Sequence, residues 1–137
     1  MIKHIVMWNV RGEDAEAHAR NVALLKSEFE SLRGRVPGLL HLEVGVDESR
    51  IDYACDVVLY TEFESREALA AYAQHPEHLR VRRTLGDLRS ARHQVDYEVK
   101  EERVATHPAR TPTPAGVDAG MPTGPTTTGD KSHVQAL

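Results

Sequence analysis

This sequence of 137 residues lacks the features that mark several classes of protein. It has one cysteine, Cys55, so no disulfide can form within the chain, and a reducing cytoplasm is the expected location. The first apolar run is short and is interrupted by His4, which fits neither a signal peptide nor a membrane span. Lys and Arg are scattered among Asp and Glu, with a formal net charge of -4. We therefore expect neither nucleic acid nor a membrane as a partner.

Motifs that bind metals or phosphates are also missing. Neither a His-Glu-x-x-His nor a Cys-x-x-Cys spacing occurs, and the neighbours His75, Glu77 and His78 match no established ligand set. There is no glycine-rich phosphate loop. Cys55 alternates with Val57 on an expected buried strand face without an assigned partner base, which favours a core position over a nucleophile. We expect no metal and no cofactor.

The composition changes sharply near Val104. The last part of the chain is rich in Pro, Thr, Gly and Ala, and five of the seven prolines lie in it. Such a segment has too few large apolar side chains to offset the entropy lost on ordering. The sequence therefore predicts one folded domain over residues 1–103 and a disordered tail over residues 104–137.

Hydrophobic periodicity in the folded part alternates between strand and helix. Ile2–Val10 has apolar side chains on both faces, which is typical of a central strand. After an N-cap at Asp14, apolar residues recur every three or four positions as far as Val36, which predicts a helix of about six turns that Pro37 ends. Further strands are expected over 40–46, 53–63 and 92–99.

A second helix is expected between the third and fourth strands. It begins at the cap Ser65, breaks at Pro76 and resumes to about Arg89, because proline lacks an N–H and disfavours helix before it. The resulting order is β-α-β-β-α-β, an α+β ferredoxin-like arrangement whose helices cover one face of the sheet. Since the first strand is apolar on both faces, we expect the open face to pack against a second copy of the chain.

The proline break brings polar side chains close to two helix ends. Tyr72, His75 and His78 surround Pro76 and could converge on a cavity. A neutral His78 could take a proton from a carbon next to a carbonyl, with Tyr72 donating a hydrogen bond to the developing enolate. The structural alternative is that His75 caps the new helix and His78 binds the carbonyls that the break leaves free.

The first strand and second helix add further candidates. His4 shares a face with Trp8, so His4 is either a polar group in a cavity or a hydrogen-bonded core histidine, and Trp8 is a candidate for contact with a substrate. Arg80, Arg82 and Arg83 read most simply as a solvated helix face, although such a cluster could attract an anionic ligand.

Short motifs follow one another in a characteristic order along residues 1–100: Met1–Val6, Val36–Gly38, Leu42–Gly45, Asp56–Leu59, Glu62–Ser65, His75–His78 and Val95–Tyr97. In this combination the chain resembles the stress-responsive α/β-barrel (Dabb) domain family. Members are ferredoxin-like protomers whose sheets pack face to face, so the resemblance implies a homodimer with a dimeric α/β barrel.

The resemblance implies several functions rather than one. A plant cyclase of the family has its catalytic tyrosine and histidine at the positions of Tyr72 and His78, and a first-strand histidine at that of His4. It has a further histidine where this chain has Val57. Another plant relative cleaves cyanohydrins, other plant members are stress proteins without a known reaction, and many bacterial members have no assigned activity.

We therefore expect a homodimer that binds a small apolar or carbonyl compound in a protomer cavity. One alternative is a cofactor-independent lyase or cyclase acting on a polyketide-like or carbonyl substrate, with Tyr72 and His78 as catalytic residues. The expected substrate-binding residues are His4, His75 and Trp8. The other alternative is a stress-response protein without enzymatic activity.

Overall fold

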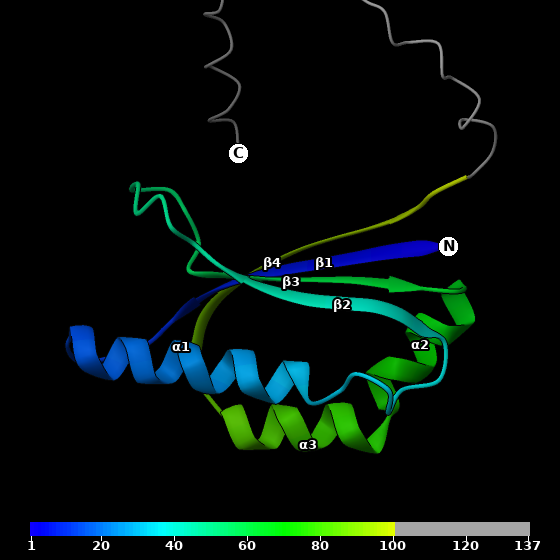
Figure 1. The fold of residues 1–137 in the computed structure, drawn as a ribbon, viewed down its shortest axis with the longest axis horizontal. Helices are drawn as coiled ribbons and strands as arrows, with labels where there is room; N and C mark the ends of the chain where they lie inside the picture. The colour runs from blue at the N-terminus through cyan, green and yellow to red at the C-terminus, as the bar shows by residue number, and fades with distance from the viewer. Residues whose placement is uncertain (101–137) are drawn as a thin grey trace, which may run out of the picture. The chain divides into compact units, whose positions relative to one another are not determined.

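The computed structural model describes residues 1–100, and the predicted tail over residues 104–137 lies outside them. Four antiparallel strands form a sheet in the order β2-β3-β1-β4, and the helices cover one of its faces (Figure 1). The predicted α+β ferredoxin-like fold is confirmed, with the second helix divided in two. The elements in chain order are β1 (Ile2–Val10), α1 (Ala15–Glu30), β2 (Leu39–Val46), β3 (Val57–Phe63), α2 (Arg66–Gln74), α3 (Pro76–Leu85) and β4 (Arg89–Glu98).

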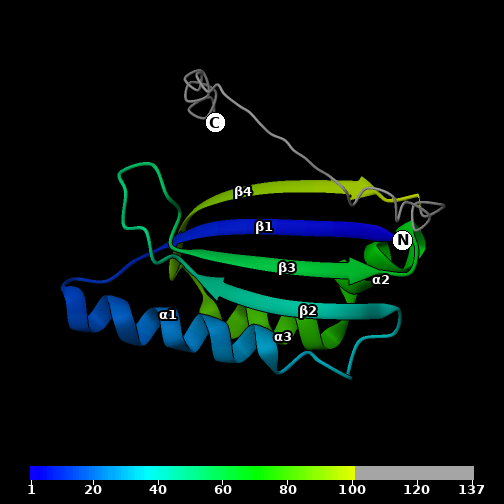
Figure 2. The same cartoon turned by 45° about the horizontal axis from the view of Figure 1, so that its top comes forward.

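The central place of β1 follows from its two apolar faces. It pairs with β3 on one side and β4 on the other, as Figure 2 shows. Val6 and Trp8 are buried beneath the helices, whereas Ile5 and Met7 point to the opposite face and are half-buried. A strand with neighbours on both edges has every backbone hydrogen bond satisfied within the sheet, which suits a run of apolar residues.

The helices are attached to the sheet by an apolar core. Asp14 caps α1 by accepting a hydrogen bond from the Ala17 N–H at 2.8 Å, as the sequence predicts. Leu25 and Phe29 of α1 and Val81 of α3 are at most 1% exposed. Burying a side chain of this kind stabilises the fold by about 1.5–3 kcal/mol.

The prediction that the first helix continues to Val36 is wrong. Residues 31–36 form turns, in which Gly34 has a φ of +77° that favours glycine. Leu32 and Val36 are nevertheless buried, at 0% and 6% exposure. Their apolar spacing therefore reflects packing onto the core and not continued helix.

The third strand is also shorter than predicted, because it begins at Val57 and not at residue 53. Tyr53 is 74% exposed and lies in a loop. The side chain of Asp56 accepts a hydrogen bond from the Val10 N–H at 2.8 Å, and this contact fixes the end of the loop. The apolar alternation before Val57 does not correspond to strand pairing.

Helix α3, the second half of the predicted second helix, ends at Leu85, and β4 begins at Arg89. The sequence instead predicts helix to about residue 89 and strand from residue 92. Gly86 has a φ of +52° and terminates α3. Leu88 then accepts a hydrogen bond from the Arg11 N–H at 2.8 Å. This correction transfers Arg89 from a helix to the start of a strand, which matters for the site below.

Within residues 1–100, no helix or loop covers the sheet face opposite the helices (Figure 1). Val95 and Tyr97 of β4 lie on it beside Ile5 and Lys3 of β1, and they are 56% and 44% exposed. Large exposed apolar side chains in a row are typical of an interaction surface. Within residues 1–100 no helix is both long enough and apolar enough to cross a membrane.

Candidate functional site

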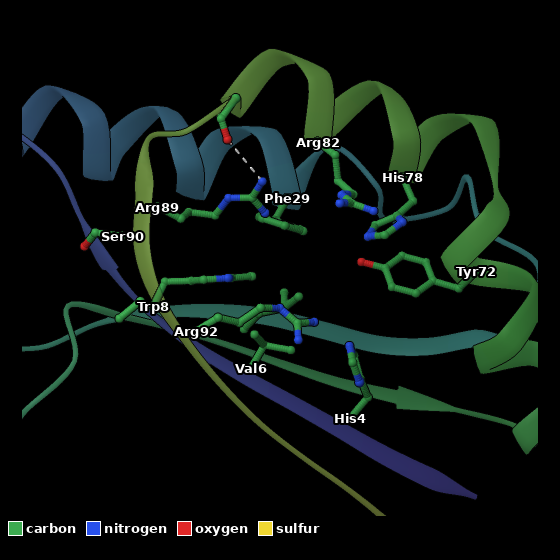
Figure 3. A pocket seen from close by; sticks show the side chains of 13 residues that line it. His4, Val6, Trp8, Phe29, Tyr72, His78, Arg82, Arg89, Ser90 and Arg92 are labelled. Carbon is green, nitrogen blue, oxygen red and sulfur yellow. Dashed lines mark hydrogen bonds between the residues drawn. The ribbon is translucent and has the colours of Figure 1, made fainter.

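A pocket of about 550 Å³ opens between the sheet and the helices. Its size is within the usual range for small-molecule sites. Every helix and every strand except β2 contributes to its lining, and Figure 3 shows the side chains pointing into it. The lining residues are His4, Val6, Trp8, Phe29, Leu59, Tyr72, His78, Arg82, Gly86, Arg89, Ser90, Ala91 and Arg92.

The break at Pro76 shapes one end of this pocket. His75 has an extended backbone and separates α2 from α3, and its Nδ1 accepts a hydrogen bond from the Glu77 N–H at 3.0 Å. His75 is therefore the N-cap of α3. It is absent from the pocket lining, so the structure does not bring it together with the other predicted substrate-binding residues.

Tyr72 and His78 do meet across the break. Their ring centroids are 4.3 Å apart although the residues are six positions apart in sequence. Tyr72 is 3% exposed, and its hydroxyl has no hydrogen-bond partner among the described residues. Burial raises the pKa of Tyr72, so the hydroxyl keeps its proton and acts as a donor.

His78 is held as a neutral imidazole with one free nitrogen. Its Nδ1–H donates to the Ala73 carbonyl at 3.2 Å, which leaves the lone pair on Nε2. Burial lowers the pKa of His78, and repulsion from Arg82, His4 and Arg89 acts in the same direction. A neutral imidazole beside a neutral phenol is a pair that can accept one proton and donate another.

His4 lies on the floor of the same pocket. Its Nδ1 is 2.6 Å from Asp96 Oδ1 on the neighbouring strand β4, and its ring centroid is 6.1 Å from that of Tyr72. A carboxylate at Nδ1 orients an imidazole and leaves Nε2 as the nitrogen available to a ligand. Sequence reasoning missed Asp96, because only the β1–β4 register places it opposite His4.

Trp8 forms an aromatic wall of the pocket. Its ring stacks on Phe29 with centroids 5.0 Å apart and an interplanar angle of 22°. The indole Nε1–H is buried without a hydrogen-bond partner in residues 1–100. The Arg89 guanidinium lies 5.7 Å from the ring centroid, within the range of a cation–π contact.

Three arginines lie in the lining, and of these the sequence pointed only to Arg82, as part of a cluster that could attract an anionic ligand. Arg82, Arg89 and Arg92 form no ion pair with a carboxylate in the part of the chain that the structure describes. The cluster of Arg80, Arg82 and Arg83, interpreted either as a solvated face or as a site for an anionic ligand, does not share one environment. Arg80 is half-buried and binds Glu28 at 2.9 Å, whereas Arg82 and Arg83 are exposed and Arg82 also lines the pocket. A usable sequence signal existed, because Arg82 has no acidic residue three or four positions away.

Two other kinds of reactive site, a metal site and a nucleophilic cysteine, were compared with the residues that the structure describes. Within residues 1–100 there is no cluster of three or more His, Cys, Asp or Glu side chains placed to hold a metal ion. Burial raises the pKa of the Cys55 thiol, and Asp56 and Asp47 add to the effect, so its reactive thiolate form is disfavoured. The pocket therefore offers organic acid–base groups and cationic donors.

Solved structures of similar proteins share this fold. A dimeric ferredoxin-like protein of unknown function from Bacteroides fragilis is 28% identical, with a TM-score of 0.65 over 72% of this chain and 95% of that chain. One from Jannaschia sp. CCS1, also described as dimeric and of unknown function, is 25% identical, with a TM-score of 0.58 over 72% of this chain and 98% of that chain.

A more distant structure is the hydroxynitrile lyase from Passiflora edulis, which is 14% identical, with a TM-score of 0.61 over 74% of this chain and 95% of that chain. At this identity the likeness is one of fold.

No curated protein sequence matches the chain. Residues 2–99, which include every strand and helix described above, match the family model of the Stress responsive A/B Barrel Domain, Dabb. The chain belongs to this family.

Proposed function

We propose that the protein is a homodimer in which each protomer binds a small organic molecule in the pocket beneath its sheet. The observation that carries this proposal is the pair of buried polar atoms, Tyr72 Oη and Trp8 Nε1, which line one pocket without a partner in residues 1–100. Leaving a buried polar group unpaired costs about 1–3 kcal/mol. A ligand that pairs with both atoms recovers that free energy on binding.

The uncovered sheet face is the proposed dimer interface. Val95 and Tyr97 supply exposed apolar surface on it, and the relatives from Bacteroides fragilis and Jannaschia are described as dimeric. The pocket lies on the other side of the sheet, among the helices. Each protomer of such a dimer therefore keeps its own complete set of the pocket residues.

Proton transfer at a carbon next to a carbonyl is a second candidate function. His78 Nε2 would take the proton, the electron pair would move onto the carbonyl oxygen, and the Tyr72 hydroxyl would donate a hydrogen bond to that oxygen. The 4.3 Å separation of the two rings and the neutral states favoured by their shifted pKa values support this assignment. The lyase from Passiflora edulis has the same fold.

Binding can be tested with the fluorescence of Trp8, which is the single tryptophan of the chain and a wall of the pocket. A library of small carbonyl compounds and organic acids should yield compounds that change this fluorescence. Tyr72→Phe should weaken them by roughly fivefold or more, the effect of one lost hydrogen bond. Tyr53→Phe is the matched control, since Tyr53 is 74% exposed in a loop.

Enzymatic activity needs a separate assay of cyanohydrins and polyketide-type substrates. Loss of an acid–base group typically lowers the rate about 10²–10⁴-fold, and this is expected for His78→Ala. His41→Ala is the control, because His41 is an exposed histidine on β2, which does not line the pocket. Binding without turnover would support the first candidate, and neither binding nor turnover would favour a stress-response role.

A further inference from the structure

We propose that the ligand of this pocket is an organic anion, and that Arg82, Arg89 and Arg92 form a subsite for its carboxylate. The inference rests on the proposed function, that the pocket binds a small molecule, and it adds the chemical class. The three side chains come from α3 and from β4, and Figure 3 shows them around one cavity.

The first argument is the charge of the lining. Three guanidinium groups face the cavity, while no Asp or Glu is among the residues that line it. The carboxyl of Asp96, next to the pocket residue His4, already binds that histidine at 2.6 Å. Burial lowers the pKa of Arg89, and repulsion from Arg82 and Arg92 adds to this, so the protonated guanidinium lies in an unfavourable environment. An anion between the arginines would remove that repulsion.

Other arginines show that this fold does supply carboxylate partners: of the eight in residues 1–100 that lie outside the pocket lining, four form ion pairs with Asp or Glu. Arg80 contacts Glu28 and Glu77, and Arg66 contacts Glu98. Arg80 is the sharpest comparison, since it lies on the same helix as Arg82 and only two residues before it. The arginines that point into the pocket are thus left with donors that a ligand can use.

The second argument is the hydrogen-bonding character of the other polar atoms. The Trp8 indole can only donate, and the protonated Tyr72 hydroxyl has no acceptor among the described residues. Together with the guanidinium groups, they give the lining a surface in which donors outnumber the two imidazole acceptors, Nε2 of His78 and Nε2 of His4. Such a surface fits a ligand rich in acceptor oxygens, and the planar guanidinium matches a carboxylate with two parallel hydrogen bonds.

The third argument, the apolar part of the lining, indicates that the remainder of the ligand is apolar. Val6, Phe29 and Leu59 line the pocket beside these donors, and the Trp8 ring adds an aromatic wall. An inorganic anion would leave these apolar surfaces without a partner. A carboxylate attached to a ring or chain of carbon atoms fills both parts of the pocket, with its apolar body against Trp8 and its charged end against the arginines.

The test compares each acid with its uncharged amide. Cyclohexanecarboxylate and octanoate are titrated into the full chain, each beside its primary amide, with Trp8 fluorescence and calorimetry as readouts. We expect each acid to bind roughly tenfold or more tightly than its amide, the ratio that a charge-assisted hydrogen bond gives. Arg82→Gln should abolish most of this preference, and Arg89→Gln and Arg92→Gln should act in the same direction.

Arg83→Gln is the matched control, because it removes the same charge from the next position of α3, and Arg83 is exposed like Arg82 but does not line the pocket. The inference is supported if the preference for the acid falls in Arg82→Gln and persists in Arg83→Gln. Equal binding of acid and amide would overturn it while leaving the proposed function standing. Binding of neither would also overturn it, and the library titration described above then decides separately whether the proposed function stands. Inorganic phosphate that competes as well as the organic acids would show a site for simple anions and overturn the assignment to an organic one.

Discussion

His4 on β1 and Asp96 on β4 are joined by a contact of 2.6 Å between Nδ1 and Oδ1, which links two neighbouring strands at the floor of the pocket. His4 is 6% exposed, so this contact is made largely away from water on the histidine side. A buried N–H that loses its acceptor is destabilising, and a histidine that loses this partner also loses its fixed orientation.

Replacing the acceptor should therefore lower the stability of the fold. We expect Asp96→Ala to reduce the free energy of unfolding by about 1 kcal/mol. Glu98→Ala on the same strand should change it by less than about 0.5 kcal/mol, since Glu98 forms an exposed ion pair. Urea unfolding of the two variants measures the difference, and equal effects would show that the His4 contact contributes nothing.

The unpartnered hydroxyl of Tyr72 gives a second prediction. Tyr72→Phe should not lower the free energy of unfolding of the ligand-free protein and should raise it by up to about 1–3 kcal/mol, because it removes a buried hydroxyl that has no hydrogen-bond partner in residues 1–100. Tyr72→Ala should lower it by about 3–5 kcal/mol, because the ring packs against Phe63 with centroids 5.1 Å apart. A large loss in Tyr72→Phe would reveal a stabilising partner for the hydroxyl and contradict its role as a free donor.

The helix cap assigned to His75 is tested by a stability measurement paired with a binding measurement. His75→Ala should lower the free energy of unfolding by about 0.5–2 kcal/mol, and His75→Asn, which keeps a capping side chain, should restore most of it. Both variants should bind ligands of the pocket with unchanged affinity when folded. Weaker binding in folded His75→Asn would show that His75 contacts the ligand and contradict a role limited to capping α3.

The pKa of His78 predicts how stability depends on pH. Burial lowers this pKa below its ordinary value of 6.5, with Arg82, His4 and Arg89 as the charged or titratable neighbours that add to the effect and the Ala73 carbonyl opposing it. Below about pH 6.5 the unfolded chain binds a proton that folded His78 binds less readily, so the free energy of unfolding falls as the pH falls. Above pH 6.5 this contribution is fully present.

Two measurements check that the pKa of His78 is lowered and that stability falls with pH for this reason. An NMR titration of the His78 ring should give a pKa below 6.5, and bound carboxylate should raise it, because a negative charge favours the imidazolium. Unfolding curves of His78→Gln between pH 7.5 and 5 should show a shallower decline than the wild type. A His78 pKa at or above 6.5 in the ligand-free protein would contradict the neutral base.

The open sheet face predicts the oligomeric state. Val95→Asp introduces a charge on β4 where a second copy is proposed to pack, so it should shift the protein towards monomer in sedimentation experiments. Ile51→Asp is the matched control, since Ile51 is 46% exposed in the loop before β3. A wild type that is monomeric at micromolar concentration, or equal behaviour of the two variants, would contradict the proposed interface.

Much of the fold could be predicted from local patterns, whereas the meeting of Arg82 with Arg89 and Arg92 around one pocket could not. The alternation in Ile2–Val10 and the His75-Pro76 pair correctly predicted a central strand and a divided helix, because strand period and missing N–H groups are local properties. Leu32 and Val36 misled the prediction of the first helix, since burial in a turn gives the same apolar spacing as a helix.

The pocket arises from tertiary arrangement. Tyr72 and His78 could be paired because both flank one break, but Asp96 reaches His4 through strand register across 92 residues of sequence. Arg82 and Arg89 lie on opposite sides of Gly86, whose positive φ ends the helix between them. Because the prediction continued the helix past that glycine, it placed Arg89 on the wrong element.

The most direct test of the central claim is the NMR signal of the Trp8 indole N–H. Trp8 is the chain's single tryptophan, and its Nε1 is buried in the pocket without a partner in residues 1–100. A ligand that occupies the pocket should shift this resonance in step with its occupancy, and organic acids should do so at lower concentration than their amides. If no compound in such a titration moves the Trp8 indole signal, or if bound compounds move only residues of the open sheet face, the pocket is not the binding site.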